Sequence, residues 1–217
     1  MTSSQPMTIL LATGNAHKVG EISAVLRDVP NFEIKSLRDF PDVEMPEETG
    51  QTMRENARLK AQSCAQQSGI AALADDSGIE VDLLGGAPGV HSARWIEGSD
   101  EDRMRALLDR TNESSTRNDE RSARYRCAIC VAFPDGRILE TEGVCEGRIA
   151  REPRGENGFG YDPIFETTPE TGAPIEYSNC TMAQIPPEAK AQVSHRARAV
   201  AAMEELLRSV ADSSQSA

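Results

Sequence analysis

The chain has 217 residues, of which 38% are hydrophobic and 27% charged, so it can bury the core of one large domain or of two small lobes. A formal net charge of −12 opposes general binding to nucleic acid, which needs a basic face, and means that local cations must hold any anionic ligand. No apolar run approaches the roughly 20 residues that cross a bilayer, so no membrane partner is expected.

The first predicted elements are a strand, a turn and a helix. Residues Met1–Met7 are polar, lack the features of a secretory signal and are expected to be flexible. The apolar run Ile9–Ala12 predicts a strand, and Thr13–Lys18 predicts a turn that opens a helix. The backbone N–H groups and the dipole at such a helix start favour an anion. Lys18 in the first helical turn strengthens this interpretation over that of an ordinary connection.

The next segment is an acidic loop that leads into a helix. Phe32–Leu37 predicts a short strand, and Asp39–Gly50 predicts a loop. The capping-box pattern Thr52-x-x-Glu55 predicts a helix over Met53–Ser68, and Gly69 ends it.

Two adjacent carboxylates follow the next apolar run. Ile70–Ala74 predicts a buried strand and Ile79–Leu83 a second one, with Asp75 and Asp76 between them. Paired carboxylates at a strand end suit a hard cation such as Mg²⁺, and one of them could activate a water as general base. The pair Glu47-Glu48 in the preceding loop could supply a further carboxylate. The alternative is that these side chains only cap turns or face solvent.

A long hairpin is predicted in the second half of the chain. Tyr125–Phe133 and Ile138–Ile149 flank a Pro-Asp-Gly turn. The first strand carries Cys127 and Cys130, which are two of five cysteines. Residues three apart in a strand point to opposite faces, so this pair is predicted to be reduced and buried rather than a zinc or redox pair. Reduced cysteines favour a cytoplasmic location.

The segment Arg151–Pro163 is rich in glycine. Within it, Gly158–Pro163 combines two glycines, which permit a close backbone approach, with two aromatic rings on which a base could stack. The alternative is an ordinary turn with buried rings.

The C-terminal part is predicted to be helical. Thr181–Val193 predicts a short, interrupted helix, and His195–Val210 a longer one, while Asp212–Ala217 is expected to be flexible. The expected inward face of the last helix consists of Ala199, Val200, Met203, Leu206 and Leu207. The order of elements predicts an α/β fold with a mixed sheet flanked by helices.

Seven motifs together resemble the inosine triphosphate pyrophosphatase family, which acts on non-standard purine nucleotides. They span Ile9 to about Leu207 in the family's order, and the chain is most similar to the bacterial dITP/XTP branch. The motifs are T-G-N-x-x-K at Thr13–Lys18, E-E-T-G-x-T-x-x-E-N-A-x-x-K-A at Glu47–Ala61, A-D-D-S-G at Ala74–Gly78, L-G-G-A-P-G at Leu84–Gly89, S-A-R-W at Ser92–Trp95, G-F-G-Y-D-P at Gly158–Pro163 and S-H-R at Ser194–Arg196.

The resemblance implies a fold, an assembly and a reaction. Residues 1–217 would form a single domain with an elongated mixed sheet, two lobes and an active-site cleft between them, and the protein would be a homodimer. The reaction would hydrolyse ITP, dITP or XTP to the monophosphate and pyrophosphate with Mg²⁺, which removes deaminated purines from the nucleotide pool.

The resemblance also implies roles for individual residues. Glu48 and Asp76 would bind metal, and Asp76 would be the catalytic base. Substrate binding would involve the turn of Thr13, Gly14, Asn15, Ala16, His17 and Lys18, in which Thr13, Asn15 and Lys18 hold phosphates, together with Lys60 and Ser77. The residues framing base and sugar would be Phe159, Gly160, Tyr161, Asp162, Lys190, His195 and Arg196.

Base choice is expected to depend on hydrogen-bond donors. Hypoxanthine and xanthine present a 6-oxo acceptor where adenine presents an amino donor, so donors such as His195 and Arg196 would favour the former. Taken alone, a His-Arg pair is more often structural, and Lys60 and Lys190 could be ordinary surface lysines. Two other functions are open: a Maf-type pyrophosphatase of different base preference, and a non-catalytic nucleotide sensor.

Overall fold

The computed structural model describes residues 6–26, 32–114, 117 and 120–215. Short 3₁₀ turns connect many of its elements. In chain order the helices and strands are β1 (Met7–Leu11), α1 (Ala16–Leu26), β2 (Phe32–Ser36), α2 (Met53–Ser68), β3 (Ala71–Val81), α3 (Asp100–Ser114), β4 (Ser122–Ala132), β5 (Ile138–Ile149), β6 (Phe165–Glu166), α4 (Pro187–Val193) and α5 (His195–Gln215).

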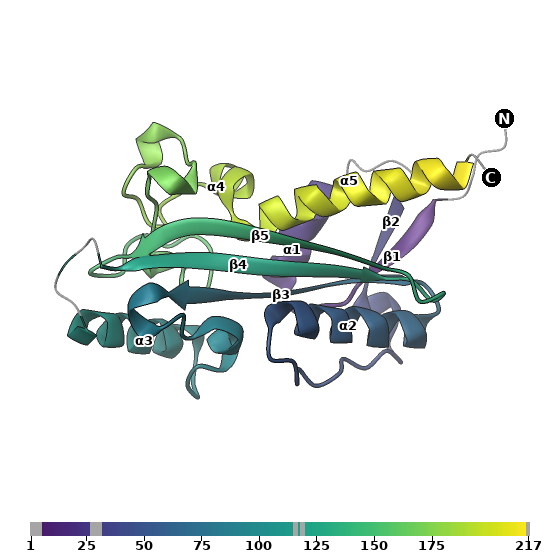
Figure 1. Ribbon diagram of the computed structural model, residues 1–217, viewed down its shortest axis with the longest axis horizontal. Helices are drawn as coiled ribbons and strands as arrows, with labels where there is room; N and C mark the ends of the chain where they lie inside the picture. Colours follow the sequence, from purple (N-terminus) through teal and green to yellow (C-terminus); the bar gives the residue numbers. More distant parts are fainter. Residues whose placement is uncertain (1–5, 27–31, 115–116, 118–119, 216–217) are drawn as a thin grey trace. The chain divides into compact units, whose positions relative to one another are not determined.

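The described strands form one mixed sheet in the order β2-β1-β3-β4-β5-β6 (Figure 1). Strand β1 is parallel to both β2 and β3, whereas β6 is antiparallel to β5. Parallel neighbours need crossovers, which α1 and α2 provide, and β4 and β5 follow each other through the Phe133–Arg137 turn. The predicted α/β fold with a mixed, helix-flanked sheet is confirmed.

The chain divides into two compact units. Unit 1 comprises residues 1–76, 127–143 and 196–217, and unit 2 comprises residues 77–126 and 144–195. The unit boundary falls within strands β3, β4 and β5, so each of these strands contributes residues to both units. That the whole chain forms a single two-lobed domain stays a prediction.

The core of unit 1 lies against the face of the sheet that α1 and α5 cover. It joins apolar side chains of β1, β3 and β4 to both helices, and Figure 1 shows α2 on the opposite side of these strands from α5. The buried residues of α5 in this core are Ala199, Val200, Met203 and Leu207. Leu206 was expected to face inward but is 37% exposed, because it lies at the edge of the apolar stripe.

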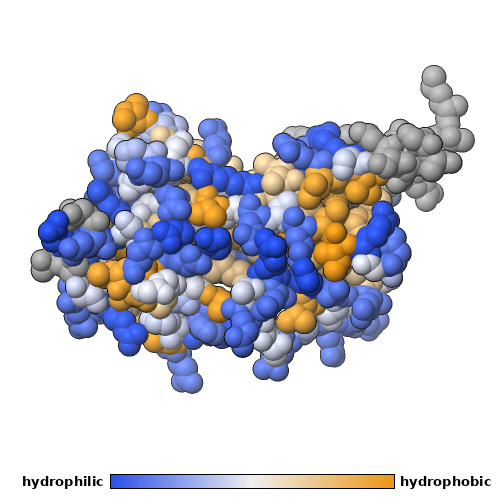
Figure 2. All heavy atoms as spheres, viewed as in Figure 1, coloured by the Kyte–Doolittle hydropathy of each residue, from blue (hydrophilic) through white to orange (hydrophobic). Residues whose placement is uncertain are grey.

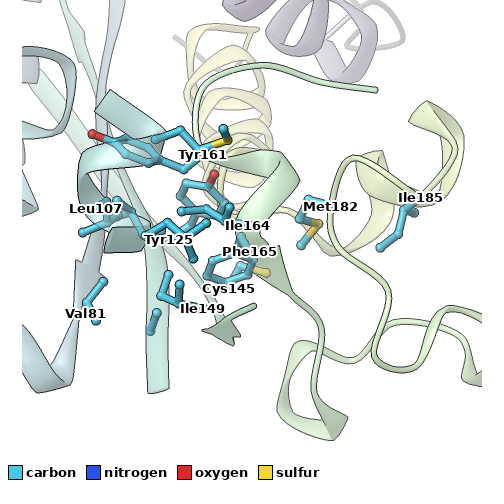
Figure 3. Close-up of a cluster of buried hydrophobic side chains, with 14 of the residues drawn as sticks. Val81, Leu107, Tyr125, Cys145, Ile149, Tyr161, Ile164, Phe165, Met182 and Ile185 are labelled. Carbon is cyan, nitrogen blue, oxygen red and sulfur yellow. The ribbon is translucent and has the colours of Figure 1, made fainter. Parts of the chain in front are cut away.

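The core of unit 2 gathers side chains from β3 to β6, α3 and the later loops. Tyr125, Tyr161 and Phe165 are its large rings, and Figure 3 shows them among Ile164 and Cys145. Met104, Leu107 and Leu108 anchor α3 to the same core. The outer surface differs from these cores: hydrophilic residues predominate on the face in Figure 2. Within the described residues, no helix is both long and apolar enough to span a membrane.

Helix α2 agrees closely with the sequence prediction. The side chain of Thr52 accepts a hydrogen bond from the Glu55 N–H, and Glu55 completes the capping box. Gly69 ends the helix in the left-handed conformation with φ of 71°.

Three predicted boundaries were wrong. Two strands were expected around Asp75-Asp76, but β3 runs continuously through Ala71–Val81. The helix expected over Thr181–Val193 begins only at Pro187, because a proline suits the first helical position but disfavours helix in the residue before it. The expected flexible ends are shorter as well: Met7 pairs with Phe32 in β1, and α5 extends to Gln215. The remaining residues of those ends, 1–5 and 216–217, lie outside the described residues.

Neighbouring leucines on α5 offer a matched test of the unit 1 core. Leu207 is 1% exposed and Leu206 is 37% exposed. Leu207→Ala should lower the free energy of unfolding by about 2–5 kcal/mol, since it leaves a cavity, whereas Leu206→Ala should cost less than about 1 kcal/mol. Urea denaturation measures both. Equal losses would show that the inward face of α5 is assigned incorrectly.

The prediction of buried, reduced cysteines on β4 is confirmed. Cys127 and Cys130 are free thiols with almost no exposure, and Cys127 alone of the two joins the core beneath α1 and α5. Burial raises the pKa of each thiol to about 12.

Alkylation should therefore discriminate among the cysteines. At pH 8 a thiol with a pKa of about 12 is a thiolate about 10⁻⁴ of the time, so folded Cys127 and Cys130 should resist iodoacetamide while the half-buried Cys180 reacts first. Mass spectrometry of native and urea-unfolded protein provides the measurement. Rapid labelling of Cys127 in the folded protein would contradict its burial.

Candidate active site

The turn between β1 and α1 is built around Asn15. Its side-chain oxygen accepts hydrogen bonds from the N–H groups of His17 (2.9 Å) and Lys18 (3.3 Å), so Asn15 caps the helix. The Asn15 N–H donates in turn to the Thr13 hydroxyl at 3.2 Å. Residues 14–17 are exposed, so this part of the predicted anion site faces solvent. The cap engages two of the N–H groups that a phosphate was expected to use.

Asp75 is a fully buried carboxylate held by cations from two helices. One of its oxygens lies 2.9 Å from Lys18 Nζ on α1 and 3.3 Å from Arg196 Nε on α5. Arg196 also pairs through Nη1 with Glu21 of α1. Burial by itself raises the pKa of Asp75, but Lys18 and Arg196 outweigh it and hold the pKa of this carboxyl well below its usual range. Asp75 is thus ionised and links α1 to α5.

Asp76 meets a different set of partners. Its Oδ2 accepts a hydrogen bond of 3.0 Å from the Asn56 amide, and its Oδ1 lies 3.9 Å from Lys60 Nζ. Both partners belong to α2. Consecutive residues of a strand point to opposite faces, which separates the partners of Asp76 from those of Asp75. The expectation that the two aspartates act as a pair was therefore wrong; the neighbouring carboxylate is Glu48, which Lys60 reaches at 2.6 Å.

The donor set around Asp76 fits a magnesium ion. Glu48 and Asp76 supply carboxylate oxygens, and no group of three or more metal-ligating side chains occurs in the described ranges. Mg²⁺ typically takes one or two carboxylates and completes its coordination with water and substrate phosphates, so two are sufficient. Lys60 Nζ lies within 4 Å of both carboxylates, so the space between Glu48 and Asp76 already accommodates a positive charge.

The ionisation of Asp76 differs from that of Asp75. Burial raises its pKa above the usual value, and Lys60 and the Asn56 hydrogen bond oppose this shift without cancelling it. A carboxylate with a raised pKa is a better proton acceptor than an ordinary aspartate. Lys60 itself is only 6% exposed, so the interpretation of it as an ordinary surface lysine was wrong.

Unit 2 contains a second cluster, centred on Asp162. This buried carboxylate pairs with Lys190 Nζ at 2.7 Å, accepts the Phe159 N–H at 2.9 Å and accepts the Tyr125 hydroxyl at 3.3 Å. Lys190 lies 5.3 Å from the centroid of the Phe159 ring and, like Lys60, is buried rather than a surface lysine. The Phe159–Asp162 turn and α4 are therefore held together by one carboxylate.

His195 adjoins this cluster through Tyr125. The His195 ring stacks on Tyr125 with centroids 4.6 Å apart and an interplanar angle of 15°. Tyr161 is buried in the unit 2 core, and its hydroxyl donates to the Ser92 carbonyl at 2.8 Å (Figure 3). The Tyr161 ring is therefore buried and not a surface on which a base could stack. Phe159 is the partly exposed ring of the turn. Ser77 is half-buried in β3.

Ten of the candidate residues thus form two clusters of contacting side chains, one in each unit. The unit 1 cluster contains Lys18, Glu48, Lys60, Asp75, Asp76 and Arg196, and the unit 2 cluster contains Phe159, Asp162, Lys190 and His195. Sequence reasoning missed Asn56 and Tyr125. Asn56 precedes Lys60 by one helical turn, a spacing that would have placed both on one face of α2. Tyr125 carried no local signal, because its partners are 37 and 70 residues away in the chain.

Two glycines of the Phe159 turn provide a matched test of the Asp162 cluster. Gly158 and Gly160 both have positive φ, but only at Gly158 would an added Cβ meet Asp162, 2.0 Å from its Oδ2. Gly160→Ala should cost about 1 kcal/mol of stability from backbone strain alone. Gly158→Ala should cost about 3–5 kcal/mol more, because moving Asp162 breaks its buried pair with Lys190. Thermal and urea unfolding measure the difference, and equal losses would mean that Asp162 is not tightly held.

Comparisons with known proteins give a consistent result. Residues 9–206 match the Ham1 family. A dITP/XTP pyrophosphatase of Symbiobacterium thermophilum is 47% identical over 89% of this chain and 91% of its own length. One from Geobacillus kaustophilus is 44% identical over 91% and 92%, respectively.

Solved structures agree with the sequence relatives. A HAM1 protein from Coxiella burnetii aligns with a TM-score of 0.80 and 38% identity, covering 93% of this chain and 98% of its own. A structure described as a nucleoside-triphosphatase / dITP/XTP pyrophosphatase from Mycobacterium abscessus aligns with a TM-score of 0.70 and 41% identity, covering 91% and 98%.

Proposed function

Because the chain belongs to the Ham1 family, we propose that it is a nucleoside triphosphate pyrophosphatase that removes deaminated purines, as dITP, ITP or XTP, from the nucleotide pool. This membership agrees with the resemblance that the seven motifs indicate. The observation that carries the proposal is the buried Asp76, whose carboxylate lies beside Lys60 and accepts a hydrogen bond from Asn56. A carboxylate that can accept a proton and a nearby cation are what attack of water on a phosphoanhydride requires.

The proposed reaction is a single displacement at the α-phosphorus. A water oxygen forms a bond to this phosphorus, the bond to the oxygen bridging the α- and β-phosphates breaks, and pyrophosphate leaves. Asp76 accepts the proton that the water loses. The products are a nucleoside monophosphate and pyrophosphate, so hydrolysis removes the triphosphate from the nucleotide pool.

The unit 1 cluster would hold the triphosphate. The Thr13–Lys18 turn supplies the Thr13 hydroxyl and backbone N–H groups such as those of Gly14 and Ala16, while Lys18 and Lys60 supply positive charge. Both lysines are already positioned by carboxylates, Lys18 by Asp75 and Lys60 by Glu48. A cation that stays in place, as Lys18 does beside Asp75, loses little freedom on binding phosphate, which favours the charged transition state.

Magnesium belongs to this proposal. Glu48 and Asp76 would hold it, and when bound it would neutralise charge on the transferred phosphoryl group and on the leaving pyrophosphate. Lys60 would then turn from Glu48 towards the phosphates, since a cation at the two carboxylates competes with its ammonium group.

The unit 2 cluster would recognise the base and sugar. Phe159 offers a partly exposed ring for stacking, and Lys190 and His195 offer donors for a 6-oxo group, which adenine lacks. Arg196 is also expected at the base, yet its described partners are Asp75 and Glu21. Substituting Arg196 would therefore break a buried ionic network, so His195 is the better position at which to test base choice.

Other parts of the proposal are supported by the sequence and not by the site. The family resemblance implies a homodimer, the reduced cysteines favour a cytoplasmic location, and the net charge of −12 opposes a nucleic-acid partner. The relatives named above favour a dITP/XTP pyrophosphatase over a Maf-type enzyme. A non-catalytic sensor would bind ITP without releasing pyrophosphate, and the assay below separates the two.

The experiment measures pyrophosphate release from ITP, dITP, XTP, GTP and ATP with and without Mg²⁺. Wild-type protein should turn over the first three with Mg²⁺ present. Asp76→Asn should lower kcat by at least about 10²-fold, the lower end of general-base contributions, whereas the exposed control Asp42→Asn should stay near wild type. Circular dichroism checks folding. Asp76→Asn activity within a few-fold of wild type would remove the proposed base.

A further inference from the structure

The side chain of Asn56 connects two parts of unit 1 that are far apart in sequence. Asn56 is fully buried on α2. Its Oδ1 accepts a hydrogen bond of 2.8 Å from the Gly50 N–H, and its Nδ2 donates one of 3.0 Å to Asp76 Oδ2. A neutral amide can accept from an N–H and donate to a carboxylate at once, which an ionised Asp or an aliphatic side chain cannot. The residue type therefore matches both partners.

The lack of a side chain at Gly50 lets its backbone approach this amide closely. A Cβ added at Gly50 would lie 2.6 Å from Asn56 Oδ1 and 2.8 Å from the Glu55 Cβ. The close approach fixes the end of the acidic loop against the first turn of α2, two residues beyond Glu48. Asn56 thus fixes the chain that carries Glu48 and orients the carboxylate of Asp76.

A second contact holds the middle of the same loop. The backbone of Glu44 exchanges two hydrogen bonds of 2.8 Å with the Gln67 amide, also on α2. Gln67 makes no described contact with Asp76. Two similar amide contacts therefore hold the loop, one in its middle and one at its end. Of these two amides, Asn56 is the one that also contacts a candidate metal ligand.

We propose that Asn56 is a positioning residue that sets the spacing between Glu48 and Asp76 and so tunes divalent-metal affinity. This inference rests on the proposed function, because it takes these two carboxylates as the metal ligands. Second-layer hydrogen bonds of this kind hold ligand carboxylates in one orientation, and their loss typically weakens metal binding by about 10- to 100-fold.

The experiment compares three variants of the full chain without nucleotide. Mn²⁺ binding is measured by electron paramagnetic resonance and Mg²⁺ binding by calorimetry, with urea unfolding in parallel. Asn56→Ala should raise the Kd for Mn²⁺ about 10- to 100-fold. Gly50→Ala keeps Glu48, Asp76 and Asn56 but adds a Cβ that pushes the loop backbone away from the Asn56 amide, so it should also raise this Kd. Gln67→Ala should stay within about 3-fold of wild type even though it also destabilises the loop.

The outcomes separate the inference from the function on which it rests. An unchanged Kd in folded Asn56→Ala, or equal weakening in Gln67→Ala, would overturn the positioning role while wild-type activity stands. If Asn56→Ala does not fold, an unchanged Kd in Gly50→Ala would overturn it in the same way. Wild-type protein that neither binds Mn²⁺ nor releases pyrophosphate from ITP would instead overturn the proposed function, and the inference with it.

Discussion

Much of unit 1 depends on where strand β3 places two consecutive carboxylates inside the protein. Asp75 and Asp76 are both buried, and a strand directs neighbouring side chains to opposite faces. Burying a charge is costly unless cations or donors compensate for it on the same face. Each aspartate therefore needs its own partners.

The helices on the two faces supply those partners. Lys18 and Arg196 bring α1 and α5 to Asp75, while Asn56 and Lys60 bring α2 to Asp76. The result is two environments for the same residue type in adjacent positions. Asp75 has a strongly lowered pKa and links two helices, whereas burial raises the pKa of Asp76, the residue proposed to accept a proton.

Unit 2 also contains a buried carboxylate, and a different set of partners compensates for its charge. Asp162 is buried, and Lys190, a tyrosine hydroxyl and a backbone N–H satisfy it. The turn that brings this N–H to the carboxylate leaves no room for a Cβ at Gly158. In both units a buried carboxylate thus organises the residues proposed to meet substrate, and the accompanying lysines are buried because their charges are matched.

Local signals in the sequence determined much of this protein. The capping box and Gly69 predicted α2 at its observed bounds, the hairpin and the mixed sheet followed from apolar patterning, and seven motifs indicated the family. What local patterns could not determine was which partner each side chain meets. They suggested that Asp75 and Asp76 act together, that Lys60 and Lys190 could be surface lysines and that Tyr161 offers a stacking surface. Tertiary structure decided otherwise, because burial and pairing depend on helices and turns up to 121 residues away in the chain.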